Sequence, residues 1–502
     1  MSKRLLTGAG VSVLEHITKV SALFISTPLM VRHLGQEGYG QWLLGMVILG
    51  YLAMVDLGLS FSVSRFLSSA IGAKDEEKQA AIVHISQRYF RLMGWAVALG
   101  SLLASPLTLL ILGRIENSLH LIIAIIVCGC ALALRFRFRI PGLLLRSNVR
   151  YDLLAGASIV RVLLQTSCLC LVLIMGGGIL GVGLVQGGGD LLELALQRFF
   201  SKKLRFAVFK ESLTMSAEYL SNLKREMFHF TRDYMLTGFA DTLRFQAGPM
   251  VLGSVRGARD IAIYSTALRL ILTYVDITNA AFGGGVLMAF GQLHGAGESH
   301  RLEKEFRRLA KITAGFAAWA MCGIVLFAQP FLHRWLGTEF DESYAIILIL
   351  ALPYGLVGMQ FPAYNLLAAM GRQHDLMWVS CIGGVATALF TIGAGIQWGV
   401  TGVATVLGIE MLIFSSVVAP WLIYRCLHLN PLSYLGLDVL WPGFKALLLP
   451  LTVAALMHEW LVADYELLFT AGCVYTAAFV LPAPLLLLDG EGRQILKRLV
   501  GF

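Results

Sequence analysis

Ionisable side chains interrupt several of the apolar stretches that make up most of this chain, and their chemistry could be functional. In an apolar helix, a cation can neutralise an acid or bind an anionic group such as a phosphate. A carboxylate in the same setting can carry a proton or a sodium ion. The cations of this kind are Lys19, Arg161, Arg244 and Arg269, and the acids that could carry an ion are Glu15, Asp56, Asp276 and Glu410.

The spacing of these residues indicates which of them could interact. Glu15 and Lys19 are four residues apart, so they share a helical face and can neutralise each other. Glu15 and Lys19 could form either a structural ion pair or part of a functional site. Arg269 and Asp276 lie two helical turns apart, on one face but without direct contact. The spread of the cations over four apolar segments favours a polar cavity, whereas for each cation alone a salt bridge inside the bundle is an open alternative.

The elements that hold these residues must be membrane-spanning helices. The mean hydropathy is +0.73 and only 14% of the residues are charged, against about 25% in soluble domains. Residues 42–64 contain one ionisable group, Asp56, and form a helix of about 35 Å, enough to cross a hydrocarbon core of about 30 Å. Continuous rather than alternating apolar runs exclude a strand barrel. We therefore predict an all-α polytopic membrane protein with about fourteen transmembrane helices.

A repeated hairpin organises these helices. A polar turn, His33–Gln41, precedes the helix of residues 42–64, which we expect to end at Arg65. The pattern recurs about 222 residues later, at Arg256–Gly297, and further matches such as Pro141 with Pro362 keep offsets of 221 to 224. Two parallel six-helix lobes are the usual architecture for alternating access. The predicted parts are an N-lobe (1–200), an amphipathic cytoplasmic linker (201–233), a C-lobe (234–428), and helices 13–14 with a cytoplasmic C-terminus (429–502).

The distribution of cations predicts the orientation. With an even number of spans and a cytoplasmic N-terminus, 29 of the 40 lysines and arginines fall on the cytoplasmic side. Both termini are therefore expected in the cytoplasm, and the net charge of +9 reflects this topology rather than nucleic-acid binding. Arg135, Arg137 and Arg139 alternate with aromatic residues after an apolar segment, 119–134, that should extend into them. We interpret them as snorkelling interfacial arginines, with phosphate binding as the alternative.

Two sequence elements carry a resemblance to a known family. HLGQEGYGQW, at residues 33–42, is followed by a span that contains DLGLSFSVSRFLSSAIG. Over about residues 1–430 the chain resembles the polysaccharide-transporter (O-antigen and oligosaccharide flippase) family of the multidrug/oligosaccharidyl-lipid/polysaccharide exporter superfamily. One departure is Gly248, in FQAGPMVLG, where relatives often carry an acid. The resemblance implies a flippase that moves an undecaprenyl-diphosphate-linked oligosaccharide from the cytoplasmic to the periplasmic leaflet, for lipopolysaccharide O-antigen or exopolysaccharide synthesis.

This interpretation also implies what the protein works with. The expected partners are the lipid-linked oligosaccharide, the bacterial inner membrane, and a polysaccharide polymerase and glycosyltransferases, with no nucleic acid. We expect no bound cofactor and no metal, since no cysteine pair forms CxxC and no Walker motif is present. A proton or sodium gradient would then drive transport.

Three other functions remain as alternatives. A peptidoglycan-precursor flippase or a multidrug exporter would share the fold. A membrane polymerase or glycosyltransferase would be an enzyme, but the longest outward loop, around residues 334–343, is about ten residues and too short for a catalytic site. The sequence thus predicts a transporter rather than an enzyme.

Overall fold

Helices joined by short turns make up the residues that the computed structural model describes, which are 2–56, 58–108, 118–148, 150–203, 217–282, 284–457 and 465–487. Residues 204–216 of the predicted linker and the predicted cytoplasmic C-terminus after 487 lie outside this range. Eight helices in the described part are long and apolar enough to cross a membrane. The all-α, multi-span prediction is confirmed, and the number fourteen stays a prediction.

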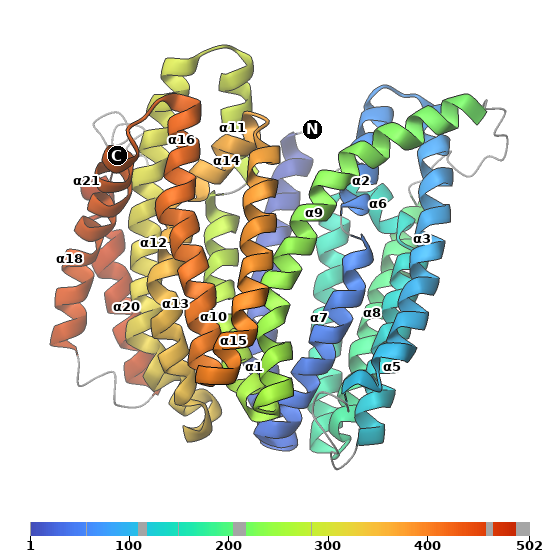
Figure 1. Cartoon of the computed structure of the whole chain (residues 1–502), viewed down its shortest axis with the longest axis horizontal. Helices are drawn as coiled ribbons and strands as arrows, with labels where there is room; N and C mark the ends of the chain where they lie inside the picture. Colours follow the sequence, from blue (N-terminus) through green and yellow to red (C-terminus); the bar gives the residue numbers. More distant parts are fainter. Residues whose placement is uncertain are drawn as a thin grey trace. The chain divides into compact units, whose positions relative to one another are not determined.

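The chain forms two compact units, Met1–Ala262 with Met377–Ala388, and Ile263–Leu376 with Leu389–Phe502. Because these units follow packing rather than the sequence repeat, the predicted lobe boundaries stay predictions. The helices of the first 203 residues are α1 (Ser2–Ala53), η1 (Met54–Asp56), α2 (Leu59–Gly72), α3 (Glu76–Ala104), α5 (Ser118–Arg137), α6 (Ile140–Ser147), α7 (Tyr151–Ile174) and α8 (Gly178–Lys203) (Figure 1).

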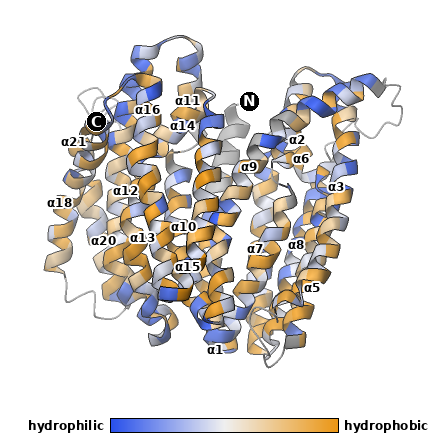
Figure 2. Cartoon of the chain, in the orientation of Figure 1, coloured by the Kyte–Doolittle hydropathy of each residue, from blue (hydrophilic) through white to orange (hydrophobic). Residues whose placement is uncertain are grey.

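The later helices are shorter on average than those of the first 203 residues, and one of them contains a break at Gly399, where φ is 60°. They are α9 (Ala217–Val255), α10 (Ala258–Phe282), α11 (Gly284–Gly295), α12 (Ser299–Leu336), η3 (Thr338–Phe340), α13 (Glu342–Met359), α14 (Phe361–Ala369), α15 (Gln373–Ile413), η4 (Phe414–Val418), α16 (Ala419–Leu427), α17 (Pro431–Ser433), η5 (Tyr434–Leu440), α18 (Trp441–Leu456), α20 (Tyr465–Val480) and α21 (Ala483–Leu487). Along most of these helices the middle is hydrophobic and the ends are hydrophilic (Figure 2), as expected for helices that cross a bilayer.

The predicted hairpin is present but its second helix is broken. Gly35, with φ of 72°, separates the two helices that make up α1, in agreement with the predicted turn. The expected end at Arg65 is wrong, because the helix stops at Asp56, restarts at Leu59 and continues to Gly72. Gly58 adopts φ of 86°, which favours glycine, and the Asp56 carboxylate accepts the Ser60 N–H at 3.2 Å and so caps α2.

The second half contains a break that corresponds to the one between η1 and α2. The sequence repeat predicted neither break. The repeated hairpin segment Arg256–Gly297 is divided between α10 and α11, and the apolar stretch of residues 344–370 is divided between α13 and α14. Short helices α6 and α14 each open on the paired prolines Pro141 and Pro362, which favour the first helical turn. They pack against α2 and α11 respectively, so the repeat persists in three dimensions.

The described half of the predicted linker is part of a longer helix. Helix α9 begins at Ala217 and continues through residue 233 into the predicted C-lobe, where it ends at Val255. Leu223 and Met227 are buried in the core formed with Val63 and Leu67 of α2, whereas Tyr219 and Phe228 of the same segment are exposed. Part of the apolar surface of this segment therefore contacts protein, and the amphipathic linker stays a prediction.

Candidate functional site

The predicted site cation Arg161 lies in a charge cluster formed by α5, α7 and α8. Its Nη1 atom lies 3.1 Å from Asp190 Oδ1 and its Nε atom 3.1 Å from Glu193 Oε2. Arg135 Nη1 lies 2.9 Å from the same Asp190 oxygen. Two arginines and two carboxylates balance, so the charge of Arg161 is neutralised inside the bundle, as the salt-bridge alternative predicts.

Glutamines extend this cluster and glycines allow it to form. Gln165 accepts from Arg161 Nη1 at 3.3 Å and donates to Gln186 at 2.5 Å. Helix α8 approaches α5 so closely that a Cβ at Gly187 would lie 3.0 Å from a Val127 methyl group. Sequence reasoning missed Asp190, although the glycines at 187–189 directly before it mark a close approach of helices.

Asp56, a predicted ion-coupling candidate, is held by hydrogen bonds at the break between α1 and α2. Ser60 Oγ donates to it at 2.7 Å, and Arg139 Nη2 forms an ion pair with it at 3.3 Å. Arg139 also donates to Ser60 Oγ through Nε at 3.2 Å. Arg135 and Arg139 both make ion pairs with acids of the bundle and are about one third exposed, so their placement at the interface stays a prediction.

Two further predicted cations pair with acids one turn away on the same helix. Lys19 Nζ lies 2.5 Å from Glu15 Oε1, as expected from their spacing, and the lysine side chain is 45% exposed. Arg244 is buried and forms an ion pair with Asp241. It also donates to the Ser380 carbonyl of α15 at 3.3 Å, which ties α9 to α15.

Helix α10 presents a polar stripe that differs from these pairs. Arg269, Thr273, Asp276 and Asn279 recur every three or four residues, and Arg269 and Asp276 are exposed. Within the described residues, neither side chain makes an ion pair. The opposite face of α10 is buried in its unit, where Tyr274 donates to the Ala317 carbonyl at 3.3 Å. Because unpaired charges are costly against lipid, this stripe requires water or a polar ligand.

The last predicted coupling residue, Glu410, is half-buried on α15. Among the described residues, no group of three histidines, cysteines, aspartates or glutamates could hold a metal ion.

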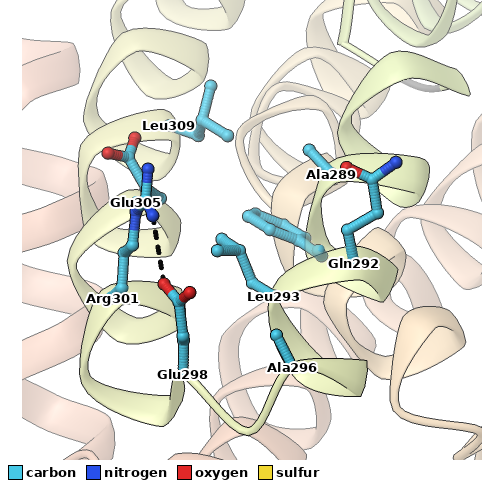
Figure 3. Close-up of a pocket in the computed structure, with 9 residues that line it drawn as sticks. Ala289, Gln292, Leu293, Ala296, Glu298, Arg301, Glu305 and Leu309 are labelled. Carbon is cyan, nitrogen blue, oxygen red and sulfur yellow. Dashed lines mark hydrogen bonds and ion pairs between the residues drawn. The ribbon is translucent and has the colours of Figure 1, made fainter.

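A pocket of about 460 Å³ lies between α11 and the start of α12 (Figure 3). Phe290, Leu293 and Leu309 supply apolar walls, and Glu298, Arg301 and Glu305 lie along one side. Its single arginine already contacts Glu298 at 3.1 Å. With two acids and one paired cation, this pocket is unsuited to an anionic ligand.

Comparison with known proteins defines the class of the fold. The chain is similar to the lipid II flippase MurJ in an inward closed conformation, with a TM-score of 0.70 and 12% identity over 99% of this chain and all of that one. It is also similar to an inward-facing multidrug resistance MATE family transporter of the MOP superfamily, with a TM-score of 0.68 and 14% identity over 82% of this chain and 98% of that one. At these identities the likeness establishes the fold, which is that of MOP superfamily transporters.

The family itself is established by sequence. Residues 29–345 match the family described as polysaccharide biosynthesis protein, and the chain belongs to this family. The chain is 24% identical over 394 residues to the succinoglycan biosynthesis transport protein ExoT of Rhizobium meliloti (strain 1021), which covers 77% of this chain and 73% of that protein. The resemblance found in the sequence is confirmed, and these relatives are transport proteins, as predicted for this chain.

Proposed function

We propose that the protein is a flippase that moves an undecaprenyl-diphosphate-linked oligosaccharide from the cytoplasmic to the periplasmic leaflet of the bacterial inner membrane. The family and the transport protein among its relatives support this proposal. A strongly polar head group cannot cross hydrocarbon unaided, so lipid-linked sugars made in the cytoplasm need such a carrier. Glycosyltransferases would supply the substrate and a polymerase would consume it. Both termini of the chain would lie in the cytoplasm.

The observation that carries the proposal is the exposed Arg269 on α10. A guanidinium without an acidic partner among the described residues can donate to two oxygens of a diphosphate at once. Lys19 is the second cation that the proposal assigns to substrate, because one contact with Glu15 leaves further ammonium donors on a side chain that is 45% exposed. Arg161 and Arg244 serve the scaffold instead.

The proposal includes ion coupling without a bound cofactor. Asp276 is the acid best suited to take up a proton or sodium ion, since it is exposed and no cation pairs with it among the described residues. Asp56 and Glu15 are each held by a cation, Arg139 and Lys19 respectively.

The test is a transport assay in vesicles that contain the purified full-length protein. We expect uptake of a lipid-linked oligosaccharide, its loss in Arg269→Gln, and partial activity in Arg269→Lys, where charge survives but bidentate geometry does not. Uptake of peptidoglycan precursor alone, or of a cationic drug alone, would favour the corresponding transporter. In cells, completed lipid-linked units on the outer surface of a deletion strain would contradict the proposal and favour a polymerase.

A further inference from the structure

One end of α12 carries two cations that share a buried carboxylate of η5. Arg307 Nη1 lies 3.1 Å from Asp438 Oδ2, and Lys311 Nζ lies 3.3 Å from Asp438 Oδ1. The Asp438 side chain is 2% exposed, whereas that of Lys311 is 44% exposed. The carboxylate therefore positions two cations that are both partly exposed. Glu303 also contacts Arg307, at 3.0 Å, through an exposed pair of the kind that contributes little.

A third cation, Lys445, lies on α18, two helical turns after Asp438. Lys445 Nζ lies 4.9 Å from the ring centroid of Trp441, which is itself half exposed. Within the described residues Lys445 has no acidic partner, so its ammonium donors are available. Helices α12 and α18 are packed together here, because a Cβ at Gly443 would lie 3.4 Å from that of Ala318. We call Arg307, Lys311, Lys445 and Trp441 the α12–α18 basic surface.

This surface lies where both helices become apolar. Lys311 is the last charged residue before the run 312–332 of α12, and Lys445 is the last before the run 446–456 of α18. Tryptophan and lysine are typical of the level at which lipid head groups lie. Beyond this level α18 exposes Leu448 and Leu449, which can contact acyl chains. By the predicted topology, this is the cytoplasmic leaflet.

We propose that the α12–α18 basic surface binds an anionic glycerophospholipid of the cytoplasmic leaflet. Lys311, Lys445 and Arg307 donate to the oxygens of its phosphodiester, and the buried Asp438 fixes the two α12 cations in position. Three cations against Asp438 and Glu303 leave a positive surplus that complements this head group. The site is independent of the transported substrate, since the stripe on α10 plays no part in it.

The test compares retention of phosphatidylglycerol and phosphatidylcholine by the full-length protein in mixed nanodiscs, with bound lipid counted by native mass spectrometry. We expect the wild-type protein to prefer phosphatidylglycerol. Lys445→Gln should lower that preference about fivefold, the value of one cation beside an anionic surface. Lys311→Gln combined with Asp438→Asn should lower it similarly, although the net charge is unchanged, because one donor and the orienting carboxylate are lost.

A matched control separates a built site from general surface charge. Arg425 lies 4.1 Å above the Trp421 ring on α16 and belongs to no such cluster. Arg425→Gln removes a charge and should leave the lipid preference within about twofold, less than the value of a cation beside an anionic surface. The proposal is overturned if the wild type retains both lipids equally, or if Arg425→Gln lowers the preference as much as Lys445→Gln. Unfolding temperatures in pure phosphatidylcholine should match the wild type for both single variants.

Discussion

The charge cluster of α5, α7 and α8 and the polar stripe of α10 both place ionisable groups in apolar helices. They differ in whether a side chain of opposite charge neutralises each group. In the cluster, Arg161 contacts Asp190 and Glu193 within 3.1 Å. On the stripe, Arg269 and Asp276 are exposed on one face, and neither makes an ion pair within the described part of the chain. A charge that is balanced inside the bundle supports the fold, whereas an exposed, unbalanced one is available to a ligand or an ion.

The comparison is tested most strongly at Asp190. Asp190→Asn strands Arg135, whose carboxylate partner in the cluster is Asp190, so we expect a loss of about 3 kcal/mol in the free energy of unfolding. The estimate is at the low end for a buried pair because Arg135 is 30% exposed. The measurement is the unfolding temperature in detergent.

The control for this prediction removes both partners. Arg135→Gln combined with Asp190→Asn leaves no stranded charge from that pair, so most of the lost stability should return. An Asp190→Asn protein as stable as the wild type would show that the cluster is not structural.

The second prediction concerns Arg269 and should show the opposite behaviour. Arg269→Gln should leave the unfolding temperature unchanged and reduce transport of lipid-linked oligosaccharide about 10- to 100-fold, the range for a hydrogen bond to a charged group. Arg244→Gln is the matched comparison, because that buried arginine pairs with Asp241 and its loss should lower stability. If Arg269→Gln also destabilises and Asp276→Asn restores it, Arg269 belongs to the scaffold.

The sequence predicted the fold well where hydropathy and the internal repeat determine it. Continuous apolar runs identified the helices, and the match of Pro141 with Pro362 indicated the repeat, whereas the two short helices that open on these prolines appear only in the structure. The break between Asp56 and Leu59 was missed because hydropathy does not report backbone conformation. The glycine at 58 and the acid two residues before it were the available signals.

The candidate site was less predictable because ion pairs between helices depend on which helices are neighbours. Arg161 and Asp190 are 29 residues apart, and nothing in their local sequence reveals that α7 and α8 place them together. Pairs one turn apart, such as Glu15 with Lys19, could be predicted because helical geometry alone brings them close. The exposure of Arg269 likewise depends on which face of α10 packs inward.

The third prediction separates Asp276, the acid assigned to coupling, from Asp56, an acid held by the scaffold. Asp276→Asn should remove the dependence of transport on an imposed proton or sodium gradient while leaving the protein folded. Asp56→Asn should retain gradient dependence and lose up to about 3 kcal/mol of stability, because asparagine can still accept the Ser60 N–H but leaves Arg139 without its carboxylate. The measurement is transport in vesicles with and without each gradient. Full gradient dependence in Asp276→Asn would rule this residue out.

The smallest effect is expected at Lys19, which combines features of both regions. Its pair with Glu15 spans one turn of a single helix and Lys19 is 45% exposed, so Lys19→Gln should cost only about 0.5 kcal/mol or less of unfolding free energy. Transport should fall several-fold, less than for Arg269→Gln, because Glu15 already takes part of its charge. Lys19→Arg is the control and should keep most activity.

If Lys19→Gln transports at the wild-type rate, the pair is structural and only the α10 stripe remains as a candidate for substrate binding. If transport instead falls as far as in Arg269→Gln, neutralisation by a neighbouring acid does not prevent a cation from serving the substrate, and Arg161 would need to be tested in the same way.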